Sequence, residues 1–144
     1  MMYFFNVLES ELVDQLDTYS EKNMSLIARR PFLQGLLNDR YVDREALPSD
    51  DGMLEARYDD WYKLWAEVQE SLPEQPTSWT DFALQFALSH PVVKSAAIAM
   101  TNVEDVERAV AIVEKGEHLS EDVLNSVSAV RDRFGFIPKE TVSD

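Results

Sequence analysis

Residues 90–109 read HPVVKSAAIAMTNVEDVERA, and this stretch contains the signals of one strand and one helix. Its small apolar run, Val93 to Ala99, predicts a strand buried in a parallel sheet. Asn102 is placed to cap a following helix, with Glu104 and Asp105 in the first turn, where the helix dipole favours negative charge. We expect the inner face of this helix to consist of Val103, Val106, Val110 and Val113. The stretch predicts one strand-helix unit of an α/β fold.

The N-terminal part of the chain predicts a strand, a helix and a second strand. The apolar run Met2 to Leu8 indicates a buried strand, and Ser25 to Ala28 indicates another. Between them, Ser10 is placed to cap a helix that ends near Lys22. The apolar positions of that helix are Leu12, Val13, Leu16 and Tyr19. This order is typical of a right-handed βαβ unit with parallel strands.

Three segments in the remaining sequence complete the predicted architecture. Arg29 to Gly52 is too long and irregular for a simple connection, and such segments are usually functional or covered by a partner. Tyr58 to Leu72 has the spacing of an amphipathic helix, and Ser78 is placed to cap an apolar helix that stops before Pro91. Ser120 is placed to cap a last helix. The sequence therefore predicts an α/β protein with about three parallel strands and flanking helices.

Composition restricts the classes of partner. The chain has 144 residues, of which 13 are Lys or Arg and 27 are Asp or Glu, giving a net charge of −14. This charge argues against nucleic acid and membrane surfaces as partners. No cysteine is present, which excludes a thiolate metal site, and we expect no metal site of carboxylates and histidines either. No apolar run approaches the roughly 20 residues that span a bilayer, so we expect a cytoplasmic protein. We expect one domain over residues 1–138 and a polar tail over 139–144.

The stretch at 90–109 resembles the cofactor-binding strand and helix of the aldo-keto reductases, which read roughly H-P-x-V-x-x-V-I-P-G-x-R-N-P-E-x-x-x-x-N. YFFNVLES at 3–10 is similar to the sixth barrel strand of that family, and SLIARRPFLQGLLNDRY at 25–41 is similar to its seventh strand and loop. FALQFALSHPVVKSAAI at 82–98 is similar to the segment entering the eighth strand. The resemblance implies the last three βα units of a (β/α)8 barrel, a partial TIM-barrel-like fold.

The resemblance also implies an incomplete cofactor site. In the family, a Gly, an Arg and an Asn of this stretch hold the adenosine and its 2′-phosphate, and here these positions are Ala99, Thr101 and Ala109. Thr101 offers a hydroxyl where an Arg fork would make two charge-assisted hydrogen bonds. The Tyr, Lys, Asp and His of the family's catalytic site belong to earlier strands, so we expect no catalytic residue here. NADP remains possible by resemblance, but no cofactor is expected for the chain alone.

The candidate residues for nucleotide binding are Arg29, Arg30, Phe32, Gly35 and Asn102. The first four follow the predicted second strand, and Asn102 marks a helix start whose amide groups suit an anion. A structural alternative is favoured for the two arginines, namely salt bridges to neighbouring acids. Structural roles are likewise favoured for the other polar and aromatic candidates: packing for His90, Trp61, Trp65 and Trp79, exposure for His118, and solvation for Asp50, Asp51, Asp59 and Asp60.

Two hypotheses for function remain open. Three strands cut from a barrel leave two open edges and one uncovered face, which either the chain's own helices or another polypeptide must cover. The first hypothesis is a non-catalytic aldo-keto-reductase-like binding or assembly subunit that self-associates through residues 1–5 or the Trp-rich helix. The alternative is half of a split or truncated NADPH-dependent carbonyl oxidoreductase that needs a separate polypeptide supplying the missing half-barrel.

Overall fold

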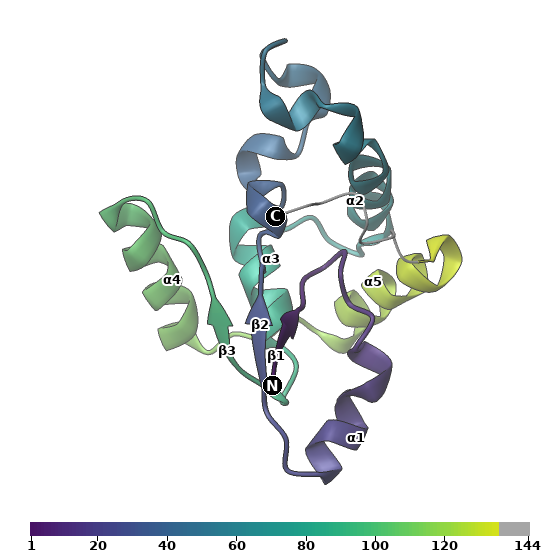
Figure 1. Cartoon of the computed structure of the whole chain (residues 1–144), viewed down its shortest axis with the longest axis vertical. Coiled ribbons are helices and arrows are strands. Elements are labelled where there is room, and N and C mark those ends of the chain that lie inside the picture. Colours follow the sequence, from purple (N-terminus) through teal and green to yellow (C-terminus); the bar gives the residue numbers. More distant parts are fainter. Residues whose placement is uncertain (136–144) are drawn as a thin grey trace.

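The computed structural model describes residues 1–135 and confirms an α/β fold. Its sheet contains three parallel strands in the order β1-β2-β3: Met2–Phe4, Leu26–Arg29 and Val93–Ala97. Five α-helices lie beside this sheet and against one of its faces (Figure 1): α1 Leu16–Glu21, α2 Asp59–Ser71, α3 Trp79–Leu88, α4 Val103–Lys115 and α5 Glu121–Phe134. The polar tail expected over 139–144 lies outside the described residues, as do the last residues of the expected domain.

The predicted caps of three helices are confirmed. The side chain of Ser78 accepts a hydrogen bond from the backbone N–H of Asp81, and that of Asn102 accepts one from Asp105. Ser120 caps α5 in the same way. α4 ends at Gly116, whose φ of 61° lies in the left-handed region that glycine adopts without strain. These boundaries were predictable because each cap depends on a few neighbouring residues.

The first strand is shorter than its sequence predicts. Residues 5–8 are buried, but they form a turn and not part of β1. The Asn6 side chain makes this turn, because its oxygen accepts hydrogen bonds from the backbone N–H groups of Leu8 and Glu9, both at 2.9 Å. Its side-chain nitrogen donates to the Arg30 carbonyl at 2.9 Å. The apolar run continues to Leu8, but the strand ends at Phe4 because the buried side chain of Asn6 stabilises a turn. β3 also ends two residues before the predicted Ala99.

The expected Ser10 cap is wrong. Ser10 is buried, and its backbone carbonyl accepts from the N–H of Val13, which opens a 3-10 turn at Val13–Gln15. The α-helix begins only at Leu16 and has no side-chain cap. Ser10 does not act as a cap because the preceding Asn6 turn and the guanidinium of Arg131, which donates to its carbonyl, hold this segment inside the protein.

The core lies between the sheet and helices α2 and α3. Trp65 is fully buried and meets Trp79 edge to face, with ring centroids 4.9 Å apart. Phe5 stacks on Phe86 at 5.9 Å, which joins the turn after β1 to α3. The tryptophans therefore pack in the core, as their helical spacing predicts.

The opposite face of the sheet is uncovered in the described part of the chain. Leu26 and Ala28 point to the helix-covered face and are fully buried. Their neighbours in the register point the other way, because successive strand residues alternate between faces. This face, which we call the open face, consists of Met2, Phe4, Ile27, Arg29, Ser95 and Ala97. Four of these six residues are exposed, in agreement with the uncovered sheet face that the sequence predicts.

The four valines of α4 correct another prediction. They were expected on the inner face of the helix, but their side chains are 42 to 67% exposed. Ile112 is the buried residue of α4, on the side that contacts α3. Periodicity identifies an apolar face of a helix without showing which side meets the rest of the chain.

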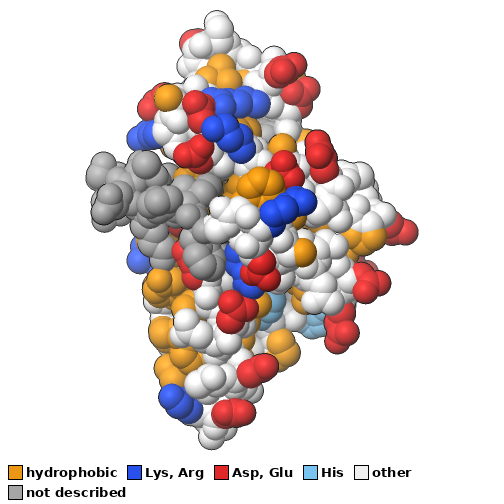
Figure 2. All heavy atoms as spheres, turned by 90° about the vertical axis from the view of Figure 1, so that its right-hand side faces the viewer, with side chains coloured by type: hydrophobic (Ala, Val, Ile, Leu, Met, Phe, Trp, Pro, Cys, Tyr) orange, Lys and Arg blue, Asp and Glu red, His pale blue; other side chains and the backbone are white. Residues whose placement is uncertain are grey.

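The surface that carries α1 and α5 is rich in acidic side chains. Figure 2 shows Asp and Glu spread over this face, while Lys and Arg occupy fewer positions. The distribution agrees with the net charge of −14. None of the helices within residues 1–135 is long and apolar enough to cross a membrane.

Candidate functional site

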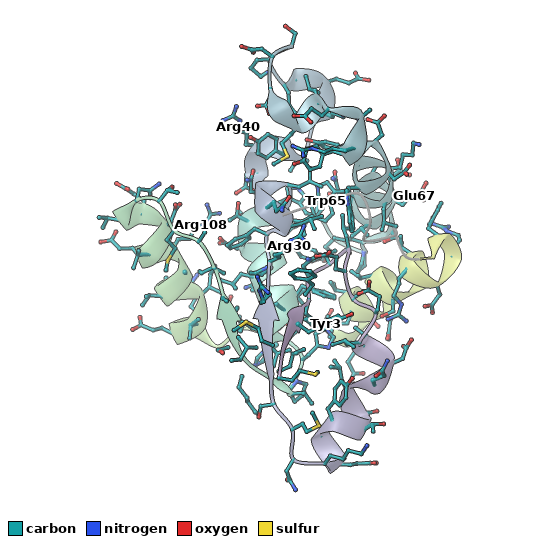
Figure 3. The ribbon with its side chains drawn as sticks, in the orientation of Figure 1. Tyr3, Arg30, Arg40, Trp65, Glu67 and Arg108 are labelled. Atoms are coloured by element: carbon teal, nitrogen blue, oxygen red, sulfur yellow. The ribbon has the colours of Figure 1, made fainter. Side chains whose placement is uncertain are left out.

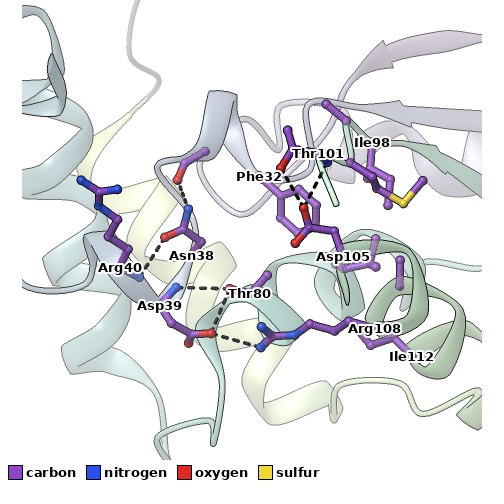
Figure 4. Close-up of a pocket in the computed structure, with 15 residues that line it drawn as sticks. Phe32, Asn38, Asp39, Arg40, Thr80, Ile98, Thr101, Asp105, Arg108 and Ile112 are labelled. Carbon is purple, nitrogen blue, oxygen red and sulfur yellow. Dashed lines mark hydrogen bonds and ion pairs between the residues drawn. The ribbon is translucent and has the colours of Figure 1, made fainter. Parts of the chain in front are cut away.

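Two hollows lie at the carboxyl ends of β2 and β3. The first has a volume of about 450 Å³ and lies between the loop around Phe32–Arg40 and the start of α4 (Figure 4). The second, of about 560 Å³, is lined by Arg29, Arg30, Gly35 and the residues that follow β3. Ligands of parallel α/β sheets commonly bind beyond the carboxyl ends of the strands. Both hollows are therefore candidate binding sites.

An internal carboxylate pairs with the donors of Thr101, just before the start of α4. One carboxylate oxygen of Asp105 accepts hydrogen bonds from the backbone N–H and the hydroxyl of Thr101, both at 3.1 Å. The backbone N–H of Asp105 in turn donates to the Asn102 side chain at 2.8 Å. Free N–H groups at a helix start attract anions, but here the N–H groups of Thr101 and Asp105 already donate to side chains of the protein.

Arg108 extends from α4 toward α3 and the 38–41 loop (Figure 3). Its guanidinium donates to the Asp39 carboxylate at 3.1 Å and also to Asp81 and Ser78. Asp39 further accepts hydrogen bonds from the backbone N–H of Trp79 at 2.5 Å and from the Thr80 hydroxyl at 2.9 Å. We call these residues the Asp39 cluster. It joins the loop, α3 and α4 at the rim of the first hollow (Figure 4).

The pKa values in the Asp39 cluster reflect this pairing. Burial alone raises the pKa of Asp39, but hydrogen bonds from Ser78, Trp79, Thr80 and Arg108 outweigh it and lower that pKa below its usual value. Burial lowers the pKa of Arg108, but the carboxylates of Asp81 and Asp39 more than compensate and raise it. Both groups are therefore charged at neutral pH, and the Arg108 guanidinium is shared between the carboxylates of Asp39 and Asp81.

The second hollow keeps two arginines and a strained loop. The guanidinium carbons of Arg29 and Arg30 lie 5.2 and 4.7 Å from the ring centroid of Phe4, within cation-π range. Arg30 also forms the expected ion pair, with Glu9 at 3.8 Å. The loop has positive φ at Arg30, Leu33, Gln34 and Gly35. Positive φ is costly for the three non-glycine residues, and such strain often marks functional loops.

The structure brings together four of the five candidate residues from the sequence. Phe32 and Gly35 line both hollows, and Arg29 and Arg30 line the second. Asn102 lines neither hollow and its side chain serves as the cap of α4. Sequence reasoning missed the Asp39 cluster, whose members lie on three separate elements and carry no local signal.

The two histidines have structural positions. The His90 ring packs edge-on against Phe5 and Phe86, with centroids 5.1 Å apart in both cases. Burial lowers the pKa of His90 to about 4, so the ring is neutral at physiological pH. His118 is exposed, as expected. Within residues 1–135, no group of three or more His, Asp or Glu side chains is arranged to hold a metal ion.

Comparison with known proteins identifies the family of this chain. The model of the aldo/keto reductase family matches residues 3–132. Among solved structures, an aldo-keto reductase from Bacillus halodurans in its holo form has a TM-score of 0.66 and 26% identity, and its apo form gives the same values. The alignments cover 90% of this chain but only 41% of the holo and 42% of the apo chain. A search of curated proteins gives no match. A family match over most of its length, supported by the same fold, places this chain in the aldo-keto reductase family.

Proposed function

We propose that this chain acts as a non-catalytic binding or assembly subunit that retains part of the reductase fold but does not bind NADPH. The observation that carries the proposal is the position of Asp105, whose carboxylate accepts both donors of Thr101. A 2′-phosphate at this position would meet a negative charge in place of a guanidinium. Coulomb repulsion then opposes the binding that the family resemblance implies.

The three substituted positions support the proposal because they line one hollow. Ala99, Thr101 and Ala109 all face the first hollow, where the resemblance places the Gly, Arg and Asn that hold the adenosine phosphate. The charged residues of the same lining are Asp39, Asp105, Arg40 and Arg108. Arg40 is paired with Asp51 at 2.7 Å, and Arg108 belongs to the Asp39 cluster. The lining has no net positive charge for a phosphate.

The assembly role rests on the uncovered parts of the sheet. The chain spans about two fifths of the length of the solved relatives, and its open face is covered by no element within residues 1–135. Exposed apolar sheet with unpaired edges favours association with another polypeptide. That polypeptide is either a second copy of this chain or a partner that supplies more barrel strands.

A direct titration tests the proposal. NADPH is added to the full chain while nicotinamide fluorescence is followed, and NADH serves as the comparison that lacks the 2′-phosphate. We expect no saturation with NADPH in the micromolar range and no preference for NADPH over NADH. Micromolar binding of NADPH with a clear preference over NADH would overturn the proposal.

The second hollow favours one alternative, in which the chain is half of a split or truncated NADPH-dependent reductase. Arg29 and Arg30 remain at the carboxyl end of β2, where they can meet the phosphates of a dinucleotide. Under this alternative, NADPH would bind once a polypeptide with the remaining strands is added, and the Arg29→Ala and Arg30→Ala variants would weaken that binding. Binding that is absent with and without such a polypeptide excludes it.

A further inference from the structure

α4 carries an apolar stripe that no other element within the described residues buries. We call this set the valine stripe: Val103, Val106, Val110 and Val113, which are 67, 42, 48 and 61% exposed. Their spacing of three, four and three residues is the a/d pattern of helices that pack lengthwise against another helix. A helix whose apolar residues have this spacing is suited to bind one further helix.

The valine stripe faces away from the protein. The inner side of α4 is made by Ile112, which is buried, and by Asp105 and Ala109, which are half-buried. α4 stands at one end of the molecule, beyond β3, with no labelled element on its far side (Figure 1). β3 pairs only with β2 among residues 1–135, so its outer edge is open on this same side. A partner can therefore approach α4 without displacing another element.

Acidic residues border the valine stripe. Glu107 and Glu114 occupy the position that follows Val106 and Val113, which is the e position of the a/d pattern, and both are exposed. Charges at this position decide which helix a stripe accepts. In an antiparallel pair of two α4 helices, Glu107 of one copy would face Glu114 of the other, and the two carboxylates would repel each other.

A contact between α4 of one copy and α1 of another has the same problem. At the opposite edge of the sheet, α1 carries Asp17 and Glu21 and no basic residue within its bounds. Packing α4 of one copy against α1 of another would again bring acid to acid. Each copy also has a net charge of −14, which opposes self-association at low salt.

We propose that the valine stripe is a docking site for an amphipathic helix of a different polypeptide, in which Lys or Arg residues border the apolar residues. This inference rests on the proposed assembly role and specifies its partner. The valines supply apolar contact, while Glu107 and Glu114 select a basic helix over an acidic one. A second copy of this chain does not satisfy that charge requirement.

Two labelled helical peptides test the docking site. Both have Leu at the a and d positions; the basic peptide has Lys at the e and g positions, and the acidic peptide has Glu there. Fluorescence anisotropy with the full chain is expected to give a Kd at least about tenfold lower for the basic peptide, a difference that salt reduces. Equal affinities, or no binding of the basic peptide, would overturn the proposal.

Variants connect the binding to these residues. V106S/V110S should raise the Kd of the basic peptide at least about tenfold. Phe134→Ser, at a 51% exposed apolar residue of α5, should leave that Kd unchanged. E107K/E114K should reverse the preference toward the acidic peptide. Circular dichroism of each variant confirms that the fold is kept.

Light scattering of the chain alone provides the remaining outcome. A stable dimer that V106S/V110S dissociates would show that a second copy occupies the stripe and would overturn the proposal. None of these measurements involves a nucleotide. The proposal of a docking site and the proposal that NADPH does not bind are therefore tested independently.

Discussion

The Asp105 carboxylate lies 3.1 Å from both the backbone nitrogen and the hydroxyl oxygen of Thr101. An internal carboxylate thus pairs with both donors of the residue that precedes the N-cap of α4. Thr101 also stands where the family resemblance expects an arginine. A positive group is missing and a negative one is present, and these two changes act in the same direction on a bound phosphate.

Reversing both changes should restore affinity for a 2′-phosphate. For T101R/D105N we predict at least about tenfold tighter binding of adenosine 2′-monophosphate than for the unmodified chain, because one charge-assisted hydrogen bond contributes roughly 1.5 to 3 kcal/mol. Isothermal titration calorimetry measures the Kd. The matched control is T101R/D122N, which keeps Asp105 and removes an acid from the first turn of α5. Equal gains in both double variants would show that Asp105 does not oppose the phosphate.

The Asp39 cluster should contribute to stability. Asp39→Ala removes the acceptor for Ser78, Trp79, Thr80 and Arg108. Because the Asp39 side chain is 44% exposed, we discount the lost hydrogen bonds and expect a decrease of about 1 to 2 kcal/mol in the free energy of unfolding. Urea denaturation measures it. Asp60→Ala, which removes an exposed ion pair with Lys63 and an acid in the first turn of α2, should change stability by less than about 1 kcal/mol.

The lowered pKa of Asp39 gives this contribution a pH dependence. A carboxyl whose folded pKa lies below its unfolded value stabilises the protein above the unfolded pKa, and the contribution is lost as pH falls through the folded pKa. The difference in stability between the unmodified chain and Asp39→Ala should therefore be full at neutral pH and shrink below pH 3.8. If the stability difference between the two proteins were the same at neutral pH and below pH 3.8, the hydrogen bonds assigned to the Asp39 carboxylate would be contradicted.

His90 should make the protein sensitive to mild acid. Its pKa is about 4 in the folded chain and 6.5 in the unfolded one, so between these values the unfolded state binds a proton that the folded state does not. Stability should fall as pH drops from 6.5 to 4, by at most about 3 kcal/mol from this group. Urea denaturation of His90→Phe should lack this part of the pH dependence, since the carboxyls are the same in both proteins. His118→Gln, at an exposed position, should behave like the unmodified chain.

How far the sequence predicts the fold depends on how local each signal is. The caps Ser78, Asn102 and Ser120 act over three residues, so their helices were predicted within one or two positions. Ser10 has the same chemistry but lies in a segment that Asn6 and Arg131 hold in place through contacts distant along the chain. Such tertiary contacts override a local propensity and leave no trace in the neighbouring residues.

The candidate site shows the same limit. Arg29, Arg30, Phe32 and Gly35 were predictable because they lie together in one loop after β2. The partners of Arg108 lie 27, 30 and 69 residues away along the chain, so no spacing rule connects them. The spacing of the four valines predicted that they share one face of the helix. That this face points outward depends on the tertiary contacts of α4, which the spacing does not show.

Two arginines of α5 should differ sharply in their effect on stability. Arg131 is 7% exposed and donates to the Asp14 carboxylate at 3.0 Å, to Asp132 at 2.7 Å and to the Ser10 carbonyl at 3.4 Å, which ties α5 to the segment before α1. Arg133 is 60% exposed, forms an ion pair with Glu67 at 2.9 Å and lies over the Phe134 ring, 4.7 Å from its centroid. Because the carboxylates of Asp14 and Asp132 remain exposed when Arg131 is removed, no charge is left buried. We therefore expect Arg131→Ala to cost about 1 to 3 kcal/mol, from lost hydrogen bonds and packing of the side-chain stem, and Arg133→Ala less than about 1 kcal/mol. Thermal and urea denaturation of the two variants measure this difference, and equal losses would show that the burial of Arg131 adds nothing to its pairing.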